Sequence, residues 1–145
     1  MTGRLDAIWL KRAHRGKMDP VPEATAVQGK GLVGDVNRSR RRQVTIIERA
    51  AWAHMMFELG ADASPVGRRA NLLVSGVPLH QTRGRILRVG AVRFAIGGET
   101  TPCERMEEYL PGLRAVMRAS WRGGVFAQVL DDGIISVGDA AAFEP

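Results

Sequence analysis

Cys103 is the single cysteine of the chain, and it lies where several signals for the start of a helix coincide. Thr101 suits the N-cap position, Pro102 suits the first helical position, and Glu104 completes a Thr-x-x-Glu capping box. The motif predicts a helix with Cys103 in its first turn. There the positive end of the helix dipole favours the thiolate, which is the form that attacks electrophiles or binds metal. Cys103 is therefore the candidate catalytic residue and metal ligand. The alternative is a lone cysteine that packs as a small apolar residue.

Arginines beside two predicted strands are the candidate anion-binding residues. Arg68 and Arg69 precede one strand, and Arg122 precedes another. Guanidinium groups bind phosphate at two points, and the side chains of Asn71 and Ser75 could add hydrogen bonds to a polar ligand. The alternative is that these arginines are solvated or paired with carboxylates.

The charge of the chain is uneven. Its formal net charge is +6, and residues 1–72 hold 13 of the 21 Lys and Arg residues but only 7 of the 15 Asp and Glu residues. Arginine accounts for 18 of the 21. This excess suits an anionic ligand, although an arginine-rich codon usage would also produce it.

The basic run from Arg38 to Arg42 raises the question of nucleic-acid binding. Aromatic residues make up only 6% of the chain and none lies within the run, so a stacking platform for bases is not evident. A solvated basic loop is the preferred interpretation. The three histidines lack the spacing of metal ligands.

The glycine-separated apolar segments predict a single domain over residues 1–145, mainly β, folded as a closed or nearly closed β-barrel with a few short helices. Turn residues between the segments support this fold class, and Asp132-Gly133 suggests a hairpin between the last two strands. The expected strands are Leu5 to Leu10, Gln43 to Ile47, Asn71 to Ser75, Arg85 to Val89, Val92 to Ile96, Val125 to Leu130 and Ile134 to Val137.

Two helices are expected among these strands. One runs from Glu48 to Leu59 and ends at Gly60, and the other runs from Glu104 to Ala119 with a break at Pro111-Gly112. Residues 11–42 are polar and contain two prolines, which indicates a long loop. No apolar run approaches the roughly 20 residues of a membrane span, and the N-terminus lacks the apolar core of a signal peptide. We therefore expect a cytoplasmic protein without membrane contact.

Several motifs, taken in order over about residues 30–140, closely resemble the MOSC domain family, named for the molybdenum cofactor sulfurase C-terminal domain. The set is similar to a stand-alone bacterial member and is far more specific than any one of its parts. The motifs are Gly31-Leu-Val-Gly34-Asp35, Arg42-Gln-Val-Thr-Ile-Ile-Glu48, Arg68-Arg69-Ala-Asn71 through Val77, Thr101-Pro102-Cys103-Glu-Arg-Met106, Arg122-Gly123-Gly124 through Leu130, and Ile135-Ser-Val-Gly138-Asp139.

The resemblance implies a β-barrel that handles the molybdenum cofactor (molybdopterin) or sulfur destined for it, with Cys103 at the family's cysteine. Members are proposed to ligate molybdenum through this cysteine and to reduce N-hydroxylated substrates, or to carry sulfur on it as a persulfide. Arg68, Arg69, Asn71 and Arg122 would then hold the phosphate and pterin. The partner would be an external reductase or a cysteine desulfurase.

Two departures from relatives bear on the choice between these roles. Val36 follows Gly34-Asp35 where relatives with reductase character often have histidine. The sequence also contains no pyridoxal-phosphate-dependent desulfurase domain of the kind that some members carry. Three hypotheses remain: a molybdenum-dependent reductase, a sulfur carrier, and a non-enzymatic module that binds its partner through the basic run.

Overall fold

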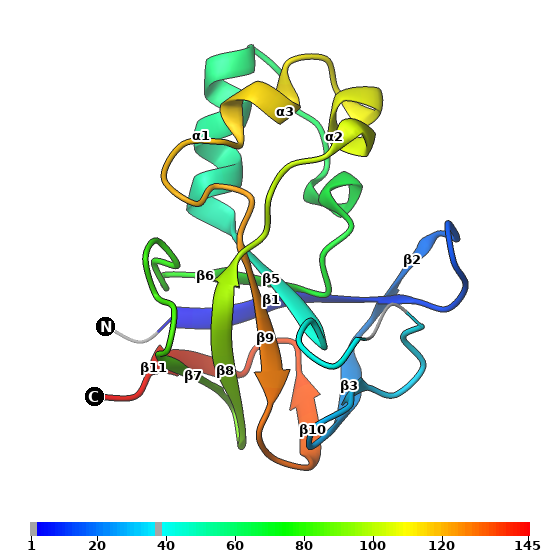
Figure 1. The fold of residues 1–145 in the computed structure, drawn as a ribbon, viewed down its shortest axis with the longest axis vertical. Helices are drawn as coiled ribbons and strands as arrows, with labels where there is room; N and C mark the ends of the chain where they lie inside the picture. The colour runs from blue at the N-terminus through cyan, green and yellow to red at the C-terminus, as the bar shows by residue number, and fades with distance from the viewer. Residues whose placement is uncertain (1–2, 37–38) are drawn as a thin grey trace.

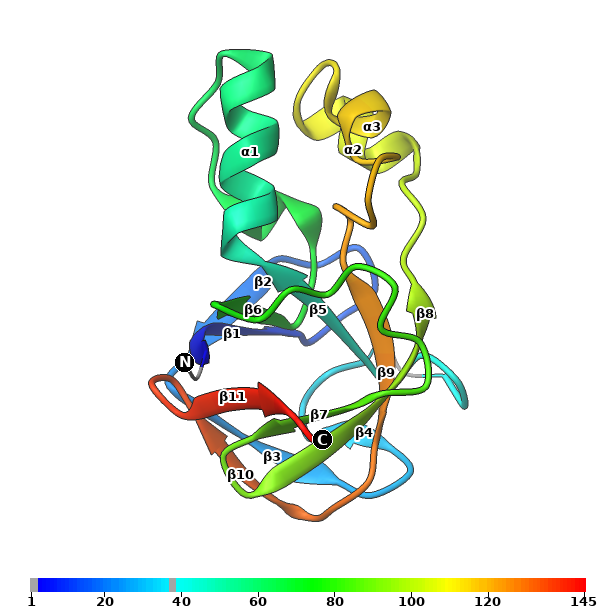
Figure 2. The same ribbon diagram turned by 90° about the vertical axis from the view of Figure 1, so that its left-hand side faces the viewer.

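Seven strands close into a β-barrel in the computed structural model, which describes residues 3–36 and 39–145 (Figures 1 and 2). The barrel order is β11–β7–β8–β9–β5–β6–β1, and β11 pairs back onto β1. This confirms the predicted mainly β class and barrel. The strands are β1 (Gly3–Lys11), β5 (Val44–Glu48), β6 (Leu72–Ser75), β7 (Ile86–Val89), β8 (Val92–Glu99), β9 (Val125–Val129) and β11 (Ala140–Phe143).

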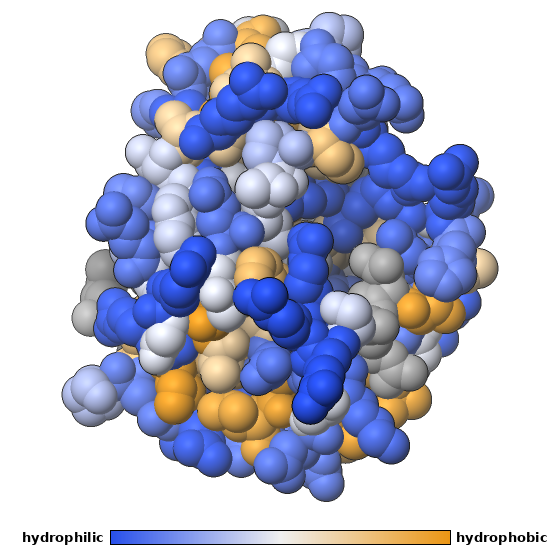
Figure 3. All heavy atoms as spheres, in the orientation of Figure 1, coloured by the Kyte–Doolittle hydropathy of each residue, from blue (hydrophilic) through white to orange (hydrophobic). Residues whose placement is uncertain are grey.

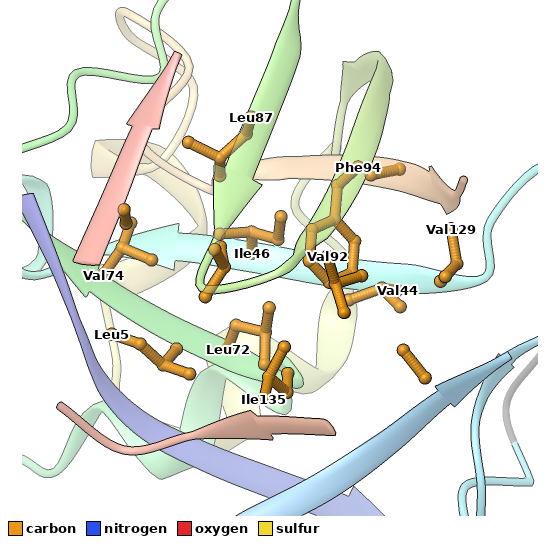
Figure 4. Packing of buried hydrophobic residues seen from close by; sticks show 14 of the residues in the cluster. Leu5, Val44, Ile46, Leu72, Val74, Leu87, Val92, Phe94, Val129 and Ile135 are labelled. Carbon is orange, nitrogen blue, oxygen red and sulfur yellow. The ribbon is translucent and has the colours of Figure 1, made fainter. Parts of the chain in front are cut away.

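The core fills the inside of the barrel. In β8, buried and partly exposed residues alternate, so that Val92, Phe94 and Ile96 point inward. Figure 4 shows residues from several strands meeting there, among them Leu5 and Leu72. The period-two apolar pattern of the sequence is therefore what closes the sheet around one core.

The helices gather at one end of the barrel (Figures 1 and 2). They are α1 (Arg49–Leu59), the 3-10 helix η1 (Pro65–Arg68), α2 (Glu104–Tyr109) and α3 (Leu113–Val116). Gly60 ends α1 in a left-handed conformation, as predicted (φ 60°). The second predicted helix is indeed broken near Pro111-Gly112, although helical structure ends at Val116 rather than Ala119. The parallel strands β5 and β6 are joined by α1 and η1, which brings η1 to the same end as α2.

The predicted loop over residues 11–42 was wrong, because three strands lie within it: β2 (Met18–Val21), β3 (Glu23–Val27) and β4 (Gly31–Leu32). Pro20 is tolerated in β2 because that strand lies at the edge of its sheet. Arg38, part of the basic run, lies outside the described residues.

The predicted hairpin on Asp132-Gly133 was also wrong. Both edges of β9 are taken by β5 and β8, so β10 (Gly133–Ser136) pairs with β3 in a separate sheet of order β10–β3–β4. The turn residues were recognised correctly, but the partner strand had been assigned to a loop. Within the described part of the chain, no helix has the length and apolar character that crossing a membrane requires.

The junction between β9 and the helical end depends on Gly124. Its φ is +91°, and a Cβ there would lie 2.1 Å from the carbonyl oxygen of Ile46. We predict that Gly124→Ala lowers the free energy of unfolding by more than about 3 kcal/mol, because backbone must move to relieve the clash. Gly138→Ala is the control. Its φ is +101° but nothing lies within 4 Å, so only backbone strain of about 1–2 kcal/mol is expected. Urea unfolding measures both; equal losses would contradict this explanation.

Candidate functional site

Cys103 is free and exposed at the helical end of the barrel. It is the N-cap of α2 in extended conformation (φ −130°, ψ 176°), and its side chain makes no capping hydrogen bond. The predicted capping box was therefore wrong, since Thr101 and Pro102 lie in the loop before the helix and Cys103 is not in the first turn. The thiol is accessible because it is exposed at the start of α2.

Arg68 holds the segment that leads to Cys103. Its Nη2 donates to Thr100 Oγ1 at 2.6 Å, and its Nε donates to the carbonyl oxygen of Gly123 at 3.0 Å. Thr100 Oγ1 also donates to that carbonyl oxygen at 2.6 Å. The end of η1, the loop after β8 and the loop before β9 are thus joined by one guanidinium group. We call Arg68, Thr100 and Gly123 the arginine clasp.

The electrostatics of the arginine clasp also connect it to the thiol. Burial lowers the pKa of Arg68 to about 10, and the neighbouring Cys103 acts in the opposite direction. This coupling places Cys103 within electrostatic reach of a buried cation.

A cleft of about 740 Å³ opens beside Cys103, between the β1–β2 connection and α2. Its size lies within the range of pockets that bind small molecules. In Figure 3 hydrophilic side chains surround a hollow between the helices and β2. The charged residues of the lining are Arg15, Lys17, Arg69, Arg105, Glu104 and Glu108. We call this space the basic cleft; Cys103 directly precedes two of its lining residues.

The positive groups of the basic cleft are close enough to influence one another. Burial, followed by the charge of Arg105, lowers the pKa of Arg69. Burial, followed by the charges of Arg69 and Arg105, also lowers the pKa of Lys11, which lies outside the lining. The Nη2 of Arg69 donates to the carbonyl oxygen of Gly16 at 2.8 Å, but its buried Nε has no partner among the described residues. An anion bound here would reduce the repulsion and could accept this free donor.

Tyr109 forms part of the opposite wall. Its hydroxyl donates to the carbonyl oxygen of Ser64 at 2.9 Å, and its ring occupies the space where a Cβ on Gly67 would lie. Contact between Gly67 and the ring fixes α2 against η1. Val66 and Met18 add apolar surface to the cleft, which suits the face of a flat heterocycle.

Asn71 is close to the site but is fully engaged in the fold. Its Nδ2 donates to the carbonyl oxygen of Trp9 and to Asp35 Oδ1, both at 3.1 Å, and its Oδ1 accepts from the Thr45 amide. Asp35 Oδ1 also accepts from the Lys11 amide at 2.8 Å. Asn71 therefore joins β1 and β5 beneath the basic cleft, together with Asp35.

The structure does not bring Ser75 and Arg122 to the basic cleft. Ser75 lies at the far end of β6, opposite Arg4 and roughly 13 Å along the strand from Asn71. Arg122 pairs with Glu58 of α1 and donates to the carbonyl oxygen of Val116 at 3.2 Å. Arg15, Lys17 and Arg105, which do line the cleft, were not among the candidate ligand residues that the sequence indicated. Two of them fell in the supposed loop, where only their charge was a signal.

The MOSC domain family model matches residues 29–142 of the chain. Crystal structures of similar fold include YuaD from Bacillus subtilis, with a TM-score of 0.81 and 21% identity over 97% of this chain and 94% of that chain. YiiM from Escherichia coli has a TM-score of 0.75 and 17% identity over 100% and 70% of the two chains. YiiM from Geobacillus stearothermophilus has a TM-score of 0.75 and 13% identity over 99% and 75%. No curated protein matches the sequence at a significant level.

The arginine clasp predicts that substitution of Arg68 destabilises the protein more than substitution of Arg105, which is also near the thiol. Arg68→Met should lower the free energy of unfolding by about 2–4 kcal/mol, because two hydrogen bonds from a charged donor are lost. Arg105→Met, a change in the lining of the basic cleft, should stay within about 0.5 kcal/mol of the parent protein. Chemical denaturation of the three proteins provides the comparison. Equal stability of the two variants would show that Arg68 does not hold the segment.

Proposed function

Because the chain belongs to the MOSC domain family, we propose that it binds the molybdenum cofactor in the basic cleft, with Cys103 as the molybdenum ligand, and reduces N-hydroxylated substrates. The observation that carries the proposal is an exposed thiol beside a cleft lined by four cationic side chains. Molybdopterin combines a phosphate with a flat pterin, and both kinds of surface are available to it here.

The chemistry of the lining fits this group. The unpartnered Arg69 Nε and the nearby Arg105 would bind the phosphate, and Tyr109 and Val66 would contact the pterin. Bound in this way, the cofactor would supply two-electron chemistry at its metal. Reduction of a hydroxylamine to an amine consumes two electrons and two protons and releases water.

The residues of the chain have separate tasks in this proposal. The Cys103 thiolate anchors the metal, and the arginine clasp holds the backbone that carries Cys103. Arg122 and Ser75 have no direct contact with the ligand, since neither lines the basic cleft. The single cysteine cannot form a disulfide within the chain, so the electrons must come from an external donor.

The alternative is a sulfur carrier, favoured by the exposure of the thiol. A Cys103 thiolate would attack the outer sulfur of a desulfurase persulfide, forming a new S–S bond and releasing the desulfurase thiolate. This role needs an accessible cysteine but gives no task to the cationic lining of the basic cleft. We therefore place it second.

Cys103→Ser should reduce retained molybdenum at least tenfold in protein purified anaerobically from a host that makes the cofactor. The serine hydroxyl is a much weaker ligand than a thiolate for a soft metal–sulfur centre. Thr101→Ala, an exposed change two residues away, is the matched control and should retain molybdenum like the parent. Elemental analysis measures the content. Equal molybdenum in the parent and in Cys103→Ser would contradict ligation, and a labile sulfur adduct without molybdenum would favour the carrier.

Arg105→Gln should weaken retention of the pterin about five- to tenfold, since one charge-assisted contact to phosphate is lost. Arg118→Gln, which removes an exposed arginine outside the basic cleft, is the control. Fluorescence of the oxidised pterin released from each protein reports retention without any activity assay. Equal release from both variants would exclude Arg105 from the phosphate site.

A further inference from the structure

A second positive surface lies outside the basic cleft, on the outer side of β8 and β9. Its members are exposed arginines, and none has a carboxylate within 4.0 Å in the described part of the chain. Figure 3 shows deep blue side chains grouped over these strands. We call this surface the basic face; it consists of Arg40, Arg41, Arg42 and Arg83.

The basic face is organised around Phe126 of β9. The guanidinium carbon of Arg42 lies 5.4 Å from the centroid of the Phe126 ring. Arg83 also ends near Phe126, beside Gly98. A Cβ on Gly98 would lie 3.2 Å from Arg83 Nη2 and 3.2 Å from the Phe126 ring. Gly97 and Gly98 leave room for the ring and for Arg83. The Phe126 ring thus holds the Arg42 guanidinium, and the Arg83 guanidinium ends close to the same ring.

The backbone beneath the arginines is fixed as well. The carbonyl oxygen of Arg40 accepts from the side-chain amides of Gln43 and Gln128, at 3.0 and 3.1 Å. Ser39 Oγ accepts from the Arg42 amide at 3.1 Å. Arginines on a loop anchored to β9 lose less conformational freedom on binding than arginines on a free loop.

The basic face is continuous with the arginine clasp. Phe126 pairs with Gly98 and Val125 pairs with Glu99, and beyond these pairs the Thr100 amide donates to the carbonyl oxygen of Gly124 at 2.9 Å. Thr100 is the residue that Arg68 binds, three positions before Cys103. The charge of Arg42 also lowers the pKa of Arg68, in keeping with this short separation.

We propose that the basic face is the docking surface of an acidic electron-transfer protein that serves the site at Cys103. This inference rests on the proposed reductase function, which requires an external donor. Donor complexes of this kind are small, transient and steered by charge, so unpaired arginines beside the site are the complementary surface. Nucleic acid is the less suitable partner, because the Arg42 guanidinium lies over the Phe126 ring, the aromatic side chain on which a base would have to stack.

The test uses a flavodoxin as the acidic probe and measures its binding to the intact chain at increasing ionic strength. Arg42→Glu and Arg83→Glu should each raise Kd at least fivefold at low salt, and the difference should shrink as salt screens the charges. Lys30→Glu makes the same change in net charge on the β3–β4 turn, at the end of the barrel away from the helices, and should change Kd less than twofold (Figure 2). The Kd values of Arg42→Gln and Arg83→Gln should lie between those of the parent and of the charge-reversal variants. This graded series shows that the effect comes from charge and not from misfolding of one variant.

Equal Kd values for all variants, or binding of the flavodoxin that does not depend on salt, would overturn the docking surface. Tighter binding of a DNA duplex than of the flavodoxin, weakened by the same arginine substitutions, would also overturn it. Turnover of a hydroxylamine with dithionite as the electron source separates this test from the proposed function. If dithionite supports turnover but the variants bind flavodoxin like the parent, only the docking surface fails. If dithionite supports no turnover in cofactor-loaded protein, the reductase function fails, and with it the donor role of the basic face.

Discussion

The position of the thiol depends on one buried cation. Arg68 reaches from the end of η1 to Thr100 and Gly123, and its two hydrogen bonds connect η1 to the segments after β8 and before β9, which also bind each other through Thr100. Gly123 is part of this arrangement, since a Cβ there would lie 2.8 Å from the carbonyl oxygen of Thr100. A buried guanidinium is expensive in free energy unless its donors are satisfied, and here two of its nitrogens find oxygen acceptors. Because the buried charge is stable only with both acceptors in place, it favours one arrangement of η1, the segment after β8 and the segment before β9.

Cationic groups then divide into two sets around this support. Those of the basic cleft face inward between α2 and the β1–β2 connection, where mutual repulsion and burial make an anion favourable. Those of the basic face lie in the segments before β5 and before β7, beside β8 and β9, where they are exposed. Part of the arginine excess seen in the composition thus gathers at two locations in the structure.

The sequence predicted the barrel because inward and outward residues alternate along its strands, as in β8. It predicted Gly60 as the end of α1 because a glycine directly after a helical segment is typical of a left-handed C-terminal residue. The sequence predicted the pairing of strands less well. For example, β10 pairs with β3, which is distant in the chain and includes no strong apolar run. Local turn chemistry identifies where a strand ends but not which strand it meets.

Prediction of the site was limited in the same way. Cys103 was identified by its uniqueness, and Arg68 and Arg69 by their position before a strand. The sequence could not distinguish a residue that supports the site from one that lines it, because that depends on partners far along the chain. Arg68 is held by Thr100, 32 positions away, and Asn71 by Trp9, 62 positions away. Lys17 and Arg15 reach the cleft only because β2 pairs with β1.

The most direct measurement is a crystal structure, recorded at the molybdenum absorption edge, of protein purified anaerobically from a host that makes the cofactor. The account predicts an anomalous peak at bonding distance from Cys103 Sγ, with the pterin in the basic cleft and the phosphate against Arg69. A peak bound to other residues, or none in crystals whose protein contains stoichiometric molybdenum, would contradict it.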